Sequence, residues 1–155
     1  MTAKQILTTV ASAIAMSLIG NVAQAQADCP KAGELKNFAQ ITAQADIFTG
    51  CDVTTEVSFV GVGSGGYYVF SAYELDGLTM FRVMPLGQPP SFNQLGALEA
   101  YSVVIEHKKA DVVFTLKAGD TLRLRGTMDY RKANGYDTGI ASRVFRAQSV
   151  EVVKK

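Results

Sequence analysis

The sequence is poor in the residues from which metal centres and catalytic sites are usually built. Its 155 residues contain two cysteines, a single histidine and no tryptophan. A zinc site needs several ligands at suitable spacing, and His107 stands alone beside two lysines in a predicted turn. The nucleophile motif G-x-S-x-G is also missing, because Val62 lies two residues before Ser64, where the motif requires glycine. We therefore expect no catalytic residue, no metal ligand and no cofactor, and an exposed His107.

Long apolar runs are scarce as well. The run Ile6–Gly20 is shorter than the roughly 20 residues of a membrane-spanning helix, and hydroxyl residues interrupt it. A lysine precedes this run, and Ala23-Gln24-Ala25 follows it with the small-x-small pattern that signal peptidase recognises. We therefore expect residues 1–25 to be a signal peptide, cleaved after Ala25 or Ala27. The mature chain would then be periplasmic or secreted, with no membrane span.

The two cysteines, Cys29 and Cys51, both belong to the expected mature chain. An even number of cysteines in an oxidising compartment indicates a disulfide. The bridge would close a loop of about 22 residues and stabilise the fold by roughly 3 kcal/mol. A redox-active role is not expected, because the C-x-x-C spacing is missing. The disulfide would fasten an N-terminal arm, residues 26–50, to the first strand of the domain that follows.

Charged residues are unevenly distributed along the chain. Residues 26–107 carry three basic and nine acidic side chains, whereas residues 108–155 carry eleven basic and five acidic ones. Without the lysine of the signal segment, basic and acidic residues balance at 14 each. The roughly 130 remaining residues suffice for one domain. We expect the opposite charges to meet across its surface, and an anion-binding patch on the C-terminal half is the alternative.

Alternating apolar residues predict strands from residue 51 onward. The arm before them has weak helical periodicity and one short predicted helix. The first strand covers residues 51–61, and its apolar face comprises Val53, Thr55, Val57, Phe59 and Gly61. The glycine cluster Gly61–Gly66 matches G-x-G-x-x-G, but a strand follows it where dinucleotide binding requires a helix. This cluster is therefore expected to be a flexible hairpin loop.

Two further strands are predicted to complete an antiparallel meander in chain order. They cover Tyr67–Leu75 and Leu78–Met84, and Asp76-Gly77 joins them with a hairpin signal. If Phe81 and Val83 face the core, then the side chains between them face outward, because successive strand residues point to opposite faces. The expected outward residues are Met80, Arg82 and Met84.

The segment from Ser91 to Leu116 has two interpretations. Ser91 and Gln94 form a capping box that predicts a helix through Tyr101. After it, residues 103–105 and 112–114 are rich enough in β-branched and aromatic residues to form an extra hairpin, and the alternative continues the helix to about Lys109. The last third is clearer, with strands at 122–130 and Ser142–Val153. A bulge at Gln148-Ser149 would turn Phe145, Ala147, Val150 and Val152 to the core.

This order of elements resembles that of the OB fold. Leu116–Gly126 (LKAGDTLRLRG) is similar to the turn and fourth strand of OB domains, and Phe145–Val152 (FRAQSVEV) to their closing strand, within the anticodon-binding-like group. The resemblance implies an all-β fold with one or two short helices. Its core would be a five-stranded, OB-like Greek-key barrel over residues 51–155, with the extra hairpin between strands 3 and 4. Exported bacterial OB domains are ligand- or partner-binding proteins, which is the class that the resemblance implies.

OB folds bind their ligands on the face of strands 2 and 3, between the first and fourth loops. On this face we expect ligand-binding residues at Tyr67, Tyr68, Arg82, Arg131, Tyr136 and Arg143. The alternative is that the aromatic residues pack beneath the N-terminal arm. The predicted ligand is a small molecule, a sugar or a peptide, and the alternative function is a non-catalytic assembly partner in a cell-envelope complex. Nucleic acid is not expected, because the mature chain is neutral and exported.

Overall fold

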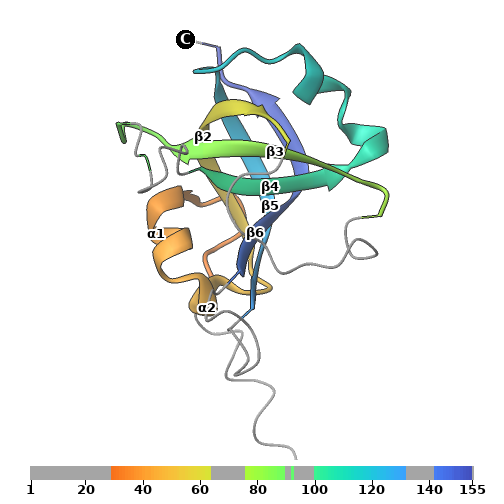
Figure 1. Cartoon of the computed structure of the whole chain (residues 1–155). Coiled ribbons are helices and arrows are strands. Elements are labelled where there is room, and N and C mark those ends of the chain that lie inside the picture. Colours follow the sequence, from red (N-terminus) through yellow and green to blue (C-terminus); the bar gives the residue numbers. More distant parts are fainter. Residues whose placement is uncertain (1–28, 64–75, 90–91, 93–99, 132–141, 155) are drawn as a thin grey trace, which may run out of the picture.

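A computed structural model describes residues 29–63, 76–89, 92, 100–131 and 142–154. Strands dominate these residues, and all six named strands belong to a single sheet that curls into a barrel (Figure 1). In chain order the elements are β1 Leu35–Asn37, α1 Phe38–Ala43, α2 Ala45–Phe48, β2 Asp52–Val62, β3 Leu78–Pro85, β4 Tyr101–Glu106, the 3-10 turns η2 His107–Lys109 and η3 Asp111–Thr115, β5 Thr121–Arg131 and β6 Ser142–Val152. Within the described ranges, no helix has the length and apolar character needed to cross a membrane.

The strand order confirms the predicted OB-like barrel. The sheet runs β1-β2-β3-β4-β6-β5, and an additional pairing of β2 with β5 closes it. β4 and β6 are parallel, whereas β2–β3, β3–β4, β5–β6 and β2–β5 are antiparallel. Five strands therefore form a closed barrel, and β1 is an extra strand that lies parallel to β2.

β2 is the strand on which the barrel depends most, because it pairs with three others. Residues 54–56 lie between β1 on one side and β5 on the other. Val57 and Ser58 lie between β3 and β5. Every residue from 54 to 58 therefore has a partner strand on both sides.

The predicted alternation of β2 holds as far as Phe59. Val53, Val57 and Phe59 are buried, and Thr55 joins them by donating its hydroxyl to the carbonyl of Lys36 at 2.8 Å. A bulge then shifts the register: Phe59 pairs with Val83, but Gly61 pairs with Arg82. The prediction that Gly61 faces the core is wrong, because the extra residue turns it to the outer face.

The bulge predicted in the last strand is confirmed. Arg125 pairs with Ser149 and Gly126 pairs with Ala147, so Gln148 is the extra residue of β6. Phe145 and Ala147 are buried on one side of the bulge, and Val150 packs against the core on the other. Val152 was also expected to face the core, but it is 43% exposed at the end of the strand.

The predicted order of the first three strands is wrong. β2 hydrogen-bonds directly to β3, so Leu78–Pro85 is the second strand of the barrel and not the third. The third is β4, which was assigned either to a helix or to a hairpin strand. The predicted strand Tyr67–Leu75 lies outside the described residues.

The segment after β4 contains no further strand among the described residues 107–120. Residues 103–105 are strand as predicted, but the 3-10 turn η3 occupies 112–114, so the extra hairpin and the helix to Lys109 are both wrong. Packing explains this outcome, since the turns place Ala110 and Val113 in the core and leave Phe114 63% exposed. Tyr101 begins β4 and is not helical, whereas most of the helix expected from Ser91 lies outside the described residues.

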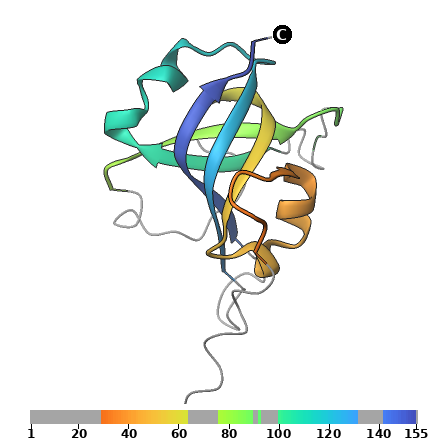
Figure 2. The same cartoon turned by 180° about the vertical axis from the view of Figure 1, so that it is seen from behind.

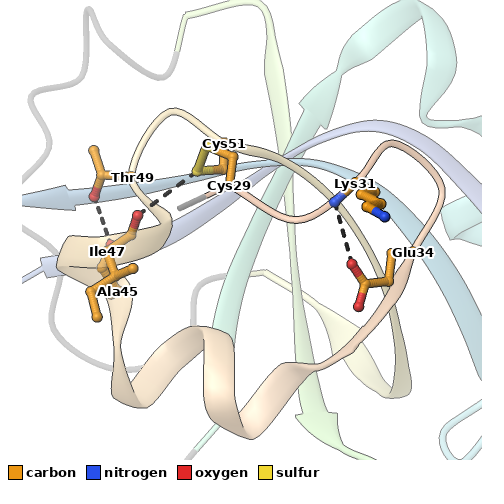
Figure 3. Close-up of a disulfide and its surroundings, with 7 residues drawn as sticks. All are labelled: Cys29, Lys31, Glu34, Ala45, Ile47, Thr49 and Cys51. Carbon is orange, nitrogen blue, oxygen red and sulfur yellow. Dashed lines mark hydrogen bonds between the residues drawn. A yellow bond between two sulfur atoms is a disulfide. The ribbon is translucent and has the colours of Figure 1, made fainter. Parts of the chain in front are cut away.

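The N-terminal arm is an integral part of the barrel core. α1 and α2 lie at one end of the barrel, and η2 and η3 lie on the opposite side (Figure 1, Figure 2). Phe38 is 2% exposed and makes edge contacts with the rings of Tyr101 and Phe145. The predicted disulfide is present: Cys29 and Cys51 are bonded, with their Cα atoms 5.4 Å apart (Figure 3). The arm is thus held by a covalent bridge and by buried aromatic contacts.

Candidate ligand-binding face

The outer surface of β3, β4 and β6 combines apolar side chains with a cation. Phe81 and Val83 of β3 point into the core, so the residues between and before them point outward. On the neighbouring strands, Val104 and Val144 also point outward. These outward residues form a second apolar cluster, in which Leu78 and Met80 are partly buried and pack against buried Val104 and Val144. We call the side chains Leu78, Met80, Arg82, Val104 and Val144 the β3–β4 face.

Arg82 is the cation of this face. It pairs with Gly61 of β2 and Ser102 of β4, and its side chain is half-buried. The Arg82 Nε is buried and has no hydrogen-bond partner among the described residues. A Cβ at position 61 would lie 3.4 Å from an Arg82 terminal nitrogen, so glycine there leaves room for the guanidinium. The alternation of β3 predicts that Arg82 points outward, but the sequence does not predict the bulge that places Gly61 next to it.

Arg146 borders the same surface but is already engaged. Its Nε donates to the carboxylate of Asp129 at 2.9 Å, and both side chains are partly buried. Val104 pairs with Arg146 across β4 and β6, which brings this ion pair next to the apolar cluster. Arg82 therefore differs from Arg146, since no carboxylate of the described residues pairs with Arg82.

The remaining predicted site residues do not join Arg82 in the described structure. Arg143 points away from the β3–β4 face, because its neighbour Val144 belongs to that face and successive residues alternate. Its guanidinium lies 5.8 Å from the ring centroid of Tyr130, within the range of a cation–π contact. Arg131 is the last residue of β5, and its side chain lies outside the described structure, as do Tyr67, Tyr68 and Tyr136.

Opposite charges of the two halves meet across β2 and β5, as predicted. Arg123 donates to Glu56 at 2.8 Å, and Arg125 donates to Asp52 at 2.6 Å. The Asp52 carboxylate raises the pKa of Arg125, chiefly through this hydrogen bond. These arginines are therefore matched by acids from the same chain. Arg123 and Arg125 are therefore paired and do not form the alternative anion-binding patch on this part of the C-terminal half.

His107 occupies an exposed turn, as predicted. It begins η2, and its Nδ1 lies 2.8 Å from the hydroxyl of Thr79. In the part of the chain that the structure describes, no three His, Cys, Asp or Glu side chains come close enough to hold a metal ion.

Comparison with known proteins gives the fold and no family. The chain matches no protein-family model and no curated protein. A putative aspartyl-tRNA synthetase from Leishmania major Friedlin is similar over 84% of this chain and 22% of its own, with 7% identity and a TM-score of 0.50. The chain folds as an OB-type barrel. It spans only about a fifth of that synthetase, so the likeness concerns one barrel.

Two smaller structures are similar at lower scores. A small single-stranded DNA-binding protein from Streptomyces coelicolor matches 66% of this chain and 93% of its own, with 11% identity and a TM-score of 0.43. The OBody AM3L09, whose structure was solved bound to hen egg-white lysozyme, matches 70% and 86%, with 16% identity and a TM-score of 0.41. Identities this low leave the ligand of the present chain to be argued from its own residues.

Proposed function

We propose that this chain is an exported, non-catalytic binding module that recognises an anionic small ligand or acidic peptide on the β3–β4 face. The observation that carries the proposal is the half-buried Arg82, whose Nε is buried and unpartnered within the described residues. Buried polar groups usually have a hydrogen-bond partner, and none of the described residues supplies one to Arg82 Nε, so this guanidinium is the cation we assign to ligand binding. A guanidinium offers several donors in a planar fork that matches a carboxylate.

The surroundings of Arg82 narrow the kind of ligand. Leu78 and Met80 are apolar and only partly buried, and they lie on the same strand and the same side as Arg82. Binding sites for small molecules commonly combine apolar lining with a few polar groups that fix orientation. A ligand with an anionic group beside an apolar group fits this arrangement, and a peptide carboxylate next to an apolar side chain is one example.

Export is supported by the sequence and by the disulfide. The first 25 residues have the pattern of a signal peptide, and the bond between Cys29 and Cys51 is of the kind that persists in oxidising compartments. The alternative function, an assembly role, requires acidic and basic surfaces that are free to dock on partners. Two pairs of those charges are satisfied within the chain, between β2 and β5, which favours the ligand-binding role.

The test is to remove Arg82 and measure binding. A panel of acidic peptides and small carboxylates is screened against the oxidised chain, and the best ligand is then titrated into Arg82→Ala. Loss of a charged hydrogen bond should weaken binding about tenfold to a hundredfold. The affinity of Arg82→Lys should lie between those of Arg82→Ala and the unchanged chain, because lysine keeps the charge but not the planar fork.

Arg123→Ala is the matched control, since it removes one arginine that is paired with Glu56 elsewhere on the barrel. Its affinity should equal that of the unchanged chain. Equal affinity of Arg82→Ala and the unchanged chain would place the site elsewhere. Tight, strongly salt-dependent binding of single-stranded DNA would instead point to a nucleic-acid role.

A further inference from the structure

A second concave site lies within the N-terminal arm, between residues 29–31 and the two short helices. It is a cavity of about 410 Å³, and residues 29–31 form one wall while α1 and α2 supply the other. This volume falls within the range of about 300–1,000 Å³ that is usual for small-molecule sites. The cavity lining includes Lys31, Glu34, Lys36, Gln40, Gln44 and Ile47.

The cavity owes its shape to the disulfide. Cys29 lines it, and the bond to Cys51 holds residues 29–31 against the end of α2 (Figure 3). Turn contacts reinforce this wall, since the Lys31 backbone N–H donates to a Glu34 carboxylate oxygen at 3.3 Å. The Glu34 backbone N–H in turn donates to the Lys31 carbonyl at 2.9 Å. The wall is therefore fixed at both ends before any ligand binds.

One cation of the cavity lining, Lys31, forms no ion pair with a described residue. Glu34 accepts from the Lys36 ammonium at 2.6 Å, and this hydrogen bond is the main reason that the pKa of Glu34 is lowered. Glu34 and Lys36 thus neutralise each other. No carboxylate of the described residues forms an ion pair with the Lys31 ammonium, so the cavity has a net positive charge.

Amide groups and one apolar side chain complete the lining. Gln40 donates to the side-chain oxygen of Gln44 at 3.3 Å, which leaves each amide with further donors or acceptors that face no described partner. Such amides can both donate to and accept from the hydroxyl groups of a ligand. Ile47 is 50% exposed and offers an apolar surface beside them.

We infer that this cavity binds a small hydroxylated carboxylate, the chemistry of an acidic sugar. The Lys31 ammonium would hold the carboxylate, Gln40 and Gln44 would bind hydroxyl groups, and Ile47 would contact the carbon skeleton. The inference does not depend on the β3–β4 face, because none of the four residues belongs to that face.

Sodium D-glucuronate is the probe, and D-glucose is the matched neutral sugar. Each is titrated into the oxidised chain while backbone amide signals are followed by NMR. Saturable shifts at residues 31, 40 and 44 are expected with glucuronate and much weaker ones with glucose. Lys31→Ala should weaken glucuronate binding about fivefold, the effect of one exposed charge, and added salt should weaken it in the unchanged chain.

Lys117→Ala is the matched control, because it removes an exposed lysine from the turn before β5, and Arg82→Ala controls for the other site. Both should bind glucuronate as the unchanged chain does. Absence of saturable shifts, equal binding of glucose and glucuronate, or unchanged affinity in Lys31→Ala would each overturn the inference. Loss of glucuronate binding in Arg82→Ala alone would assign the sugar to the β3–β4 face and overturn it as well.

Discussion

Gly126 of β5 lies between β2 and β6, with Val53 beside it on β2 and Ala147 on β6. A methyl group at this position would overlap the carbonyl oxygen of Arg146 and come within 2.8 Å of its carbonyl carbon. Both are backbone atoms that cannot rotate away. Gly126→Ala should therefore lower the free energy of unfolding by about 1–3 kcal/mol, measured by urea denaturation.

The matched comparison is Gly61→Ala, in which the nearest atom is the flexible end of the Arg82 side chain at 3.4 Å. Its stability should stay close to that of the unchanged chain. Equal effects of the two substitutions would mean that glycine is needed at 126 for a reason other than the contact with β6.

The carboxyl of Glu34 reports on its ion pair with Lys36. Its hydrogen bond from Lys36 lowers its pKa below the ordinary value of 4.5. A lowered folded-state pKa contributes stability above the unfolded pKa, and this contribution is lost as the pH falls through the folded one. NMR titration should find the Glu34 pKa below 4.5 in the unchanged chain and higher in Lys36→Met, because that substitution removes the largest lowering contribution. An unchanged pKa in Lys36→Met would show that the ion pair does not form in solution.

Among the elements, the arm makes a testable contribution through Phe38. This side chain is 2% exposed at the start of α1 and packs on Tyr101 and Phe145. Phe38→Ala should cost about 3–5 kcal/mol in unfolding free energy, because it empties a buried site between the arm and the barrel. Phe114→Ala is the matched control, since Phe114 is 63% exposed, and it should change stability by less than about 0.5 kcal/mol.

The disulfide of the same arm should stabilise the folded domain mainly by restricting the conformations of the unfolded chain. It joins residues 22 apart, and its removal in the double variant Cys29→Ser, Cys51→Ser should cost roughly 3 kcal/mol. Urea unfolding of the oxidised chain, the reduced chain and the double variant measures this effect. The last two should agree, whereas equal stability of all three would mean that the arm stays in place without the bridge.

Elements with strict alternation could be predicted from the sequence. β2 and β6 alternate clearly, and the slip at Gln148 was visible because apolar residues change parity there. β4 was harder, since its residues 102–105 are all buried and a continuous apolar run fits a helix as well as a strand. Val112, Val113 and Phe114 have strand propensity, and the turn η3 forms there because it places Ala110 and Val113 in the core.

The candidate site was predictable only in part. Arg82 follows from alternation with Phe81 and Val83, and the structure keeps it on the outer surface. The prediction for Arg143 placed it on the same surface, but the register of β6 turns it to Tyr130 instead. Val104 and Val144 join the β3–β4 face through a parallel pairing between distant segments, which no local sequence pattern encodes.

At the scale of the whole molecule, the proposed signal peptide can be tested by the processing of the chain. Expressed in a bacterium with its own first residues, the chain should be recovered from the periplasm without residues 1–25 or 1–27. Its two cysteines should then be oxidised, which mass spectrometry detects together with the new N-terminus. Recovery of an uncleaved, reduced chain from the cytoplasm would contradict the proposed export.

The pairing of β2 also bears on how the domain can come apart. Its residues 54–58 have partner strands on both sides, and those partners are β1 of the arm and β3 and β5 of the barrel. No neighbour can withdraw without exposing the strand that all of them share. We therefore expect the arm and the barrel to unfold together as one cooperative unit.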